Sequence, residues 1–474
     1  MLPSNNRMNP NETHELPRVL GARHATAIVV GIIIGSGIFL VPREMIAAVG
    51  KSSTLYIVWI VGGLLSLFGS LTYAEISSAR PAYGGEYAFL REAYGDLVGF
   101  LHMWTWWTIA KPASIASVVS GLVRTLATFS IFFFFNNPAF LGMNWGQVAA
   151  LVALWLATGL DIVGTRKAAD VQLGLTLLKV ILIIVIGAVC FGFAGPIGSL
   201  HNFSTAYLGA RGGFAGFMVA LIAALWAYDG WSDVAAVAGE VKRPQRDLPI
   251  ALVGGIVIVG GLYMLTNAAI QYVMPAAALA AADRPAADAL RLVMNSHNIF
   301  WGAALVSIGM AISITATLIA TTLSGARISF AASRDRLFFQ RIARVHPRFE
   351  TPATSLVVQA AISSLLIFAI GKFQALFSLA IFAEWITYGL AVSTVFVFRK
   401  RDKQTGKARA FSTPGYPIIP AVFIAAAIAL TVFQLADDPA NTLKGCLVIV
   451  LGIPVFFYFD NKRKAHLIRS AQAQ

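Results

Sequence analysis

The chain has 474 residues, of which 57% are hydrophobic and only 12% are charged. Soluble domains carry about 25% charged residues, so this composition excludes an ordinary soluble domain and predicts an all-α polytopic membrane protein. We interpret the formal net charge of +14 as a signal of membrane topology, and we expect the lipid bilayer, not nucleic acid, as a partner.

The predicted elements begin with a polar N-terminal tail, residues 1–18, and twelve apolar stretches follow it. Roughly 20 apolar residues cross the hydrocarbon as a helix, so each stretch predicts one transmembrane span. A polar C-terminal tail, residues 461–474, closes the chain. The stretches lie at about residues 22–48, 54–78, 97–126, 146–164, 171–194, 213–238, 249–273, 299–331, 352–370, 375–398, 416–436 and 442–459.

Lysine and arginine are concentrated in alternate connections between these stretches, on the side that holds both chain ends. Because cytoplasmic loops carry the excess of positive charge, we expect both termini in the cytoplasm and the protein in the plasma or inner membrane. Two lysines, Lys111 and Lys179, lie inside apolar stretches.

The first stretch is interrupted by Gly35-Ser36-Gly37. A membrane helix tolerates such an interruption where the freed backbone groups find another use. A helix that stops at Gly35 and restarts near Ile38 presents free N–H groups at a positive dipole end, which can hold a carboxylate or phosphate. The alternative is close helix packing through Gly31 and Gly35.

Two short connections predict helices that lie along the membrane surface. Residues 74–92 are too polar to cross, and their apolar residues recur at helical spacing. Residues 276–294 repeat that character on the opposite side. The alternative for both connections is a packed surface loop.

The sixth stretch carries Asp229-Gly230 in its middle, where a charge costs about 2.5–3.5 kcal/mol on insertion scales. It is thus interrupted at the same depth as the first stretch, five helices earlier, and the odd separation makes the two cross in opposite directions. Paired interruptions of this kind favour an inverted-repeat transporter with its site at the midplane.

Four further motifs are spread along the chain, namely Gly35-Ser36-Gly37-Ile38-Phe39, Tyr73-Ala74-Glu75, Ala227-Tyr228-Asp229-Gly230-Trp231 and Ser333-Arg334-Asp335-Arg336-Leu337. Together these motifs resemble those of the amino acid–polyamine–organocation (APC) superfamily, and the resemblance covers nearly the whole chain. Two more motifs, Pro112-Ala113-Ser114 and Trp385-Ile386-Thr387-Tyr388-Gly389, are similar to the L-type amino acid transporter branch and its bacterial relatives.

This resemblance implies a LeuT-like fold, a five-plus-five inverted repeat with two extra C-terminal helices. The first repeat would span residues 19–195, the second residues 196–400, and the extra helices residues 401–460. The resemblance also implies sodium-independent transport by alternating access, with exchange of neutral L-amino acids. The alternative is a proton-coupled carrier, or a carrier of cationic amino acids or polyamines.

Other classes of function fit the sequence less well. A channel would need repeated polar residues along one helix face, and the mid-span threonines Thr315, Thr317, Thr321 and Thr322 come closest to that pattern. A membrane-embedded enzyme would need clustered acids, histidines or a nucleophile with its base, which the stretches lack. We therefore expect no enzyme activity, no cofactor and no metal.

The resemblance places the substrate at the two interruptions. The carboxylate would lie on the N–H groups of Ser36, Gly37 and Ile38, and the ammonium on carbonyls of the broken helices. Those carbonyls belong to Ile33, Trp226 and Asp229, and Gly230 permits the unwinding. Trp226 or Tyr228 would close the site as an aromatic gate, and the alternative for either ring is plain helix packing.

Asp229 has three interpretations. Its carboxylate could contact the substrate or take a proton. It could instead cap the second half-helix by binding that helix's N–H groups, and the sequence slightly favours this capping role.

Lys179 lies near mid-bilayer with no carboxylate one turn away on its own helix. In the resembling family, a fifth-span lysine takes the place that sodium holds in sodium-coupled relatives, so the resemblance implies transport without sodium. Lys179 either couples transport to protons or is a fixed ammonium bound to the first-span backbone. Lys111 and Glu384 would be neighbours in this fold, so they could pair, or Lys111 could snorkel.

Covalent partners are not expected. Cys190 and Cys446 are the two cysteines of the chain, and residues 129–145, the loop after the third stretch, contain none. Animal members of the resembling family join a heavy chain through a cysteine in that loop, so a disulfide-linked heavy chain is not expected here.

Overall fold

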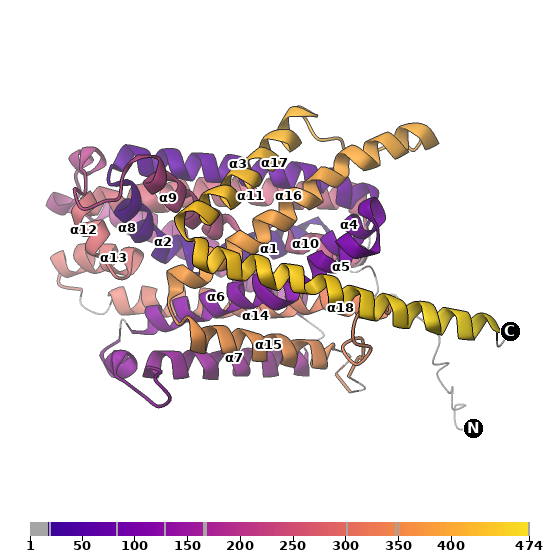
Figure 1. The fold of residues 1–474 in the computed structure, drawn as a ribbon. Coiled ribbons are helices and arrows are strands. Elements are labelled where there is room, and N and C mark those ends of the chain that lie inside the picture. Colours follow the sequence, from indigo (N-terminus) through magenta and orange to yellow (C-terminus); the bar gives the residue numbers. More distant parts are fainter. Residues whose placement is uncertain are drawn as a thin grey trace, which may run out of the picture.

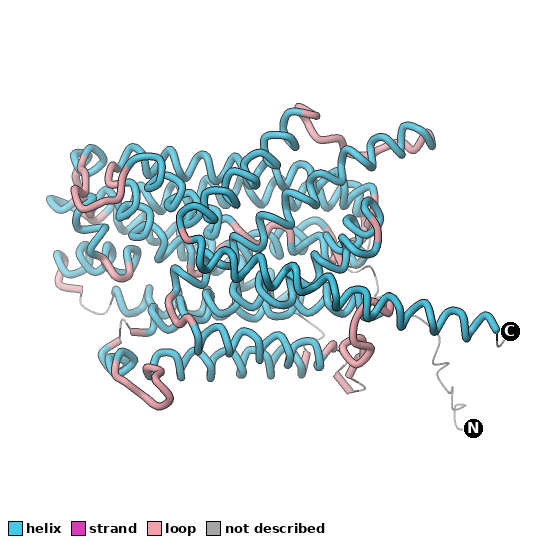
Figure 2. The backbone as a smooth tube through the Cα atoms, viewed as in Figure 1, coloured by secondary structure: helices cyan, strands magenta, loops and turns pink. Residues whose placement is uncertain are grey.

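Most helices run along one direction and form a single bundle (Figure 1). The computed structural model describes residues 18 and 20–472, except residues 82–83, 128, 165–167, 300–301, 347 and 350. Within these residues the regular elements are helices, as Figure 2 shows, and three isolated β-bridges join single residues. The all-α class is therefore confirmed, and residues 1–17 of the predicted N-terminal tail lie outside the described residues.

The long helices coincide with the predicted apolar stretches. In the described part of the chain, nine helices are long and apolar enough to cross a membrane, and one bent pair makes a tenth. The shorter apolar helix α15 (Ala353–Ala369) and the segmented third stretch complete the predicted set. The count of twelve crossings, the inverted repeat and its residue limits stay predictions. The unbroken spanning helices are α3 (Ser52–Ala79), α7 (Trp145–Val163), α8 (Ala168–Gly192), α11 (Pro244–Val273), α14 (Gly302–Arg334), α16 (Phe373–Thr405), α17 (Ile418–Asp437) and α18 (Pro439–Gln472).

The first and sixth stretches are both broken, as predicted. The first consists of α1 (Ala22–Ile33) and α2 (Gly37–Val49), which are bent by 42° at the break. The sixth consists of α9 (Gly213–Tyr228) and the short α10 (Asp233–Ala236). Helix α2 packs on α9, and α1 contacts α10, so the two breaks lie together inside the bundle.

The third stretch has an irregularity that the sequence analysis did not predict. It consists of α5 (Asp96–Thr105), a π-helical turn (Trp106–Ala110) and α6 (Lys111–Leu126). Pro112 has no N–H to donate and its ring crowds the preceding turn, and a π-helical turn is one way in which a helix absorbs such a defect. Lys111 begins the segment that follows this turn.

The two predicted surface connections contain helices. Helix α4 (Glu86–Tyr94) lies at one end of the bundle, and α12 (Ala276–Ala281) and α13 (Pro285–Ser296) lie at the other (Figure 1). Helix α18 extends to Gln472, so most of the predicted C-terminal tail continues the last helix. Its final turns project from the end of the bundle that carries α4 (Figure 1).

Candidate functional site

The break between α1 and α2 presents unpaired hydrogen-bond donors. Among the residues that the structure describes, no acceptor meets the amides of Ser36, Gly37 and Ile38. The Ser36 hydroxyl is buried and also lacks a partner. These donors lie at the N-terminus of α2, where the helix dipole favours negative charge. The break therefore presents free donors at the position where the sequence predicts a carboxylate, and binding of a carboxylate there stays a prediction.

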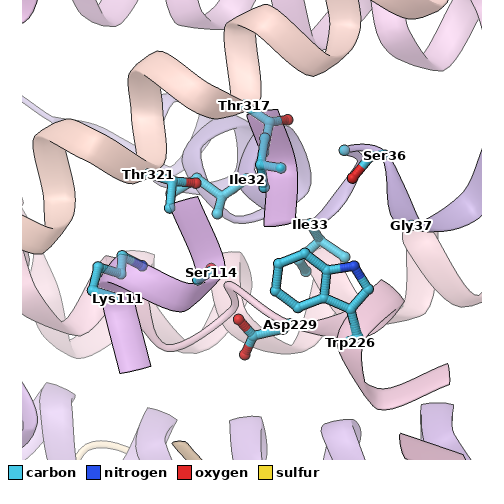
Figure 3. A pocket seen from close by; sticks show the side chains of 12 residues that line it. Ile32, Ile33, Ser36, Gly37, Lys111, Ser114, Trp226, Asp229, Thr317 and Thr321 are labelled. Carbon is cyan, nitrogen blue, oxygen red and sulfur yellow. The ribbon is translucent and has the colours of Figure 1, made fainter. Parts of the chain in front are cut away.

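A small cavity of about 20 Å³, room for about one water molecule, lies beside these donors, so the surrounding helices must separate before it can hold an amino acid. Figure 3 shows side chains from α1, α6, α9 and α14 around it. All of the lining residues except Asp229 are buried, so a substrate reaches the cavity only if helices move. The lining consists of Ile32, Ile33, Gly35, Ser36, Gly37, Lys111, Ser114, Val118, Trp226, Asp229, Thr317 and Thr321.

Five of the eight predicted substrate residues line this cavity, namely Ile33, Ser36, Gly37, Trp226 and Asp229. The predicted residues Ile38, Tyr228 and Gly230 are not part of the lining. Gly230 has φ 103°, a left-handed conformation that suits glycine, so it serves the unwinding of the sixth stretch.

The two candidate gate residues occupy different surroundings. Trp226 lines the cavity and stacks on Phe377 of α16, with ring planes 14° apart and centroids separated by 6.1 Å. The Tyr228 ring instead packs against Trp59 and Tyr263. Trp226 is thus placed to close the cavity, whereas Tyr228 fits the alternative of plain helix packing.

The predicted ammonium acceptor at Ile33 is already engaged. Its carbonyl accepts the Tyr263 hydroxyl at 2.9 Å and the Gly35 amide at 2.8 Å. The same Tyr263 hydroxyl reaches the Ala227 carbonyl at 2.8 Å. Tyr263 therefore ties the two broken helices together, and the Ile33 carbonyl has little capacity left for a substrate in this conformation.

The capping role that the sequence favoured for Asp229 is wrong. Helix α10 has Ser232 at its N-cap and no side-chain cap bond. The Asp229 carboxylate instead accepts the Tyr388 hydroxyl of α16 at 3.0 Å. Its exposure to the cavity leaves the substrate and proton interpretations of this carboxylate.

Lys111 is paired with a carboxylate that the sequence analysis did not consider. Its ammonium donates to both oxygens of Asp233, at 2.9 and 2.8 Å, and Ser324 donates to the same carboxylate at 3.1 Å. The expected pair with Glu384 is therefore wrong, and so is snorkelling, since Lys111 is only 1% exposed. Breaking such a buried pair would cost about 3–5 kcal/mol.

Lys179 on α8 is bonded to the first-span backbone, as one of its two interpretations requires. Its ammonium lies 2.6 Å from the Gly31 carbonyl of α1 and 2.6 Å from the Thr317 hydroxyl of α14. Thr317 also donates to the Ile34 carbonyl at 3.1 Å, inside the break. Lys179 thus fastens three helices next to the cavity.

The glycines of the first stretch serve both purposes that the sequence left open. A Cβ at Gly31 would lie 2.3 Å from the Thr176 hydroxyl on α8, and one at Gly37 would lie 2.7 Å from the Ala227 Cα on α9. Close packing therefore favours glycine at both positions, and most strictly at Gly37, where the neighbouring atom belongs to the backbone. Gly37 also carries one of the open amides at the break, so packing and ligand access are compatible there.

Three polar cavity residues were visible in the sequence but were not assigned to a site. Thr317 and Thr321 stood out as mid-span threonines, and Ser114 belonged to a motif. All three face the cavity from α14 and α6 (Figure 3). Ile32 and Val118 carried no signal, because they are ordinary apolar residues of apolar stretches.

Comparison with known proteins identifies this arrangement. The amino acid permease family profile matches residues 20–455. The chain is 33% identical over 461 residues to the serine/threonine exchanger SteT of Bacillus subtilis, covering 96% of this chain and 99% of that protein. It is 27% identical to the human cystine/glutamate transporter, covering 97% and 89% of the two chains, and 26% identical to the human b(0,+)-type amino acid transporter 1, covering 94% and 88%.

The chain therefore belongs to the amino acid permease family within the APC superfamily. It is a multi-pass membrane transporter of amino acids and not an enzyme, as its relatives and its apolar helices together show. The orientation of its termini stays a prediction.

Proposed function

We propose that this transporter exchanges neutral L-amino acids across the membrane without sodium, by alternating access. The observation that carries the proposal is the row of unpaired amides at Ser36, Gly37 and Ile38 beside the enclosed cavity. A zwitterion brings one carboxylate, and the N-terminus of α2 offers one site for it.

The rest of the cavity suits the other parts of such a substrate. The Asp229 carboxylate lines it and provides the negative charge that an ammonium requires. Ser114, Val118 and Trp226 border the remaining space, so the substrate side chain would meet a mixed polar and apolar wall. This lining favours small or medium neutral side chains.

Sodium independence is supported by Lys179. The Gly31 carbonyl and the Thr317 hydroxyl are oxygens of the kind that a hard cation would use, but here they are 2.6 Å from the Lys179 ammonium. A positive side chain that already occupies these oxygens would repel a sodium ion.

Alternating access is supported by polar contacts at both ends of the bundle. At the end carrying α4, the Tyr87 hydroxyl and the Arg91 guanidinium reach Asp335, after α14, at 2.8 and 2.6 Å. At the other end, Arg43 of α2 pairs with Asp283, between α12 and α13, at 2.5 Å. We propose that these contacts open in turn as the cavity faces each side.

A second candidate function is transport of cationic amino acids. The observation that favours it is again Asp229, because a carboxylate on the cavity wall could pair with a charged side chain. The two candidates differ in whether lysine or arginine competes with leucine, serine or alanine.

Uptake of a panel of labelled amino acids into proteoliposomes tests the proposal. We expect saturable uptake of neutral L-amino acids that is equal in sodium and choline media. Analogues that lack the carboxylate should not compete, because they offer nothing to the α2 amides. Strict dependence on sodium, or equal competition by amines without a carboxylate, would contradict the proposal.

A further inference from the structure

Glu384 on α16 is a fully buried carboxyl group that the transport mechanism has not yet used. It is 0% exposed, and within the described residues neither of its oxygens meets a hydrogen-bond donor. One turn further along α16, the Tyr388 hydroxyl donates to the Asp229 carboxylate on the cavity wall at 3.0 Å, which places Glu384 beside Asp229 on the same face of the helix, and the two carboxyl groups interact. Two carboxylates cannot bond to each other unless one of them carries a proton, because an ionised carboxylate only accepts.

The charges around this pair point in the same direction. Four acidic side chains meet here from separate elements, and Lys111 is the cation that faces them. Lys111 is bonded to Asp233, so its charge is balanced by that carboxylate. The other groups that face the pair are Glu86 from α4, Tyr388 from α16 and Tyr73 from α3. If all the acids were ionised, the cluster would carry a large buried negative charge, which is costly in a membrane protein.

A chain of hydrogen bonds leads from this pair toward the end of the bundle that carries α4. The Tyr388 hydroxyl donates to Asp229 at 3.0 Å, and the Ser232 hydroxyl donates to Tyr388 at 3.1 Å. The Glu86 carboxyl, which has one oxygen without a hydrogen-bond partner among the described residues, interacts with Ser232. Burial raises the pKa of Glu86 to about 7, so this group can gain and lose a proton near neutral pH.

We propose that Asp229 and Glu384 form a proton-binding site that holds one proton between them, next to the amino acid cavity. The proton reaches this site through Tyr388, Ser232 and Glu86. This inference rests on the proposed function, because it assumes that an amino acid ammonium approaches Asp229.

The proton sets the charge of the occupied site. With one proton the pair carries a single negative charge, which matches the single ammonium of a zwitterion while α2 holds the carboxylate. Without the proton the pair carries two negative charges. The transporter with its amino acid bound must then change conformation with one of these charges unbalanced. Exchange should therefore slow at alkaline pH, and the steepest fall should approach about tenfold per pH unit, the limit for loss of one proton.

Infrared spectroscopy of the purified protein tests this site directly, because a protonated carboxyl has a C=O stretch that a carboxylate lacks. We expect a carboxylic acid band in the wild type near neutral pH that is lost in Glu384→Gln and that shifts when a neutral amino acid is added. Asp161→Asn is the matched control. Asp161 is another buried carboxyl with an unpartnered oxygen, on α7 and outside the cavity lining. The Asp161→Asn protein should therefore show the same shift on addition of the amino acid as the wild type.

Transport supplies a second readout. Glu384→Gln keeps a hydrogen-bond donor toward Asp229 but removes the proton that titrates. The exchange rate of this variant should therefore no longer decrease at alkaline pH. Glu384→Ala removes the donor and should slow exchange at every pH, while Asp161→Asn should keep the wild-type profile. Identical infrared bands in the wild type and Glu384→Gln would overturn the proton site, and so would amino acid binding that leaves the band unchanged. A protein that binds no amino acid would instead overturn the proposed function, and the ligand-free band would still test the proton site.

Discussion

Replacing Lys179 tests whether the ammonium between α1, α8 and α14 controls movement of the transporter. Lys179→Ala removes two charge-assisted hydrogen bonds, to the Gly31 carbonyl and the Thr317 hydroxyl. Each is worth about 1.5–3 kcal/mol. The change also relieves the cost of a lysine in mid-membrane, about 2.5–3.5 kcal/mol. In the fastened state, the conformation in which Lys179 joins α1, α8 and α14, the two terms together give a net destabilisation of roughly 0–3 kcal/mol.

This loss should appear mainly in the transport rate. Lys179 does not line the cavity, so the dissociation constant of the amino acid should change little. The first and fifth stretches must rearrange during the cycle, and about 1.4 kcal/mol corresponds to a tenfold change in rate. Because each cycle must pass through the fastened state, a change that makes this state rarer should slow uptake, by up to about 100-fold. Sodium should not restore it, because alanine supplies no oxygen ligand.

The assay compares initial uptake rates in proteoliposomes with equilibrium binding to the purified protein. Lys179→Met keeps most of the side-chain volume, so it separates loss of charge from loss of packing. Thr176→Val is the matched control, since Thr176 also joins α8 to α1, through a neutral bond of 3.0 Å to the Ala27 carbonyl. Its effect should be smaller, about 0.5–1.5 kcal/mol. Lys179 variants with wild-type rate, affinity and pH profile would refute this reasoning.

Three further changes test other parts of the structure. Ser36→Ala should weaken amino acid binding by about 10–100-fold, as expected for a lost hydrogen bond to a charged group. Ser117 carries another buried, unpartnered hydroxyl outside the cavity lining, and Ser117→Ala should leave the affinity unchanged. Equal affinities of the two variants would contradict a carboxylate site at the α2 N-terminus. Gly37→Ala should lower thermal stability by about 1–3 kcal/mol, because its Cβ would lie 2.7 Å from the α9 backbone, whereas Gly159→Ala meets open space and should be tolerated. Burial raises the pKa of Glu86 to about 7, so the folded protein binds this proton more tightly than the unfolded chain. Stability should therefore fall, by at most about 3 kcal/mol, as pH rises from about 4.5 to 7, and Glu86→Gln should remove that dependence in thermal melts.

The breaks in the first and sixth stretches could be predicted because their residues are unusual in a membrane helix. Gly35-Ser36-Gly37 and Asp229-Gly230 interrupt otherwise apolar stretches, and both breaks are present. The bond from Lys179 to the first-span backbone could be anticipated for a similar reason. A buried ammonium needs acceptors, and its own helix offered no carboxylate.

The partners of the buried carboxyl groups could not be predicted from spacing. Asp233 follows the unwound turn at Gly230, and the direction of that turn decides that it reaches Lys111 on α6. The hydrogen bonds of Lys111 therefore go to Asp233, while Glu384 interacts with both Asp229 and Lys111. Pairings between distant helices depend on their relative rotation, which a hydrophobic pattern leaves open. The same holds for the apolar cavity wall at Val118.

Trans-stimulated uptake in sodium-free medium is the most direct test of the central claim. Proteoliposomes are preloaded with an unlabelled neutral amino acid or left empty, and uptake of the labelled amino acid is measured with sodium replaced by choline. An exchanger with its amino acid carboxylate at the α2 N-terminus and Lys179 in place of sodium predicts fast uptake into loaded vesicles and little uptake into empty ones. Uptake that requires sodium, or that is equally fast into empty vesicles, would contradict the claim.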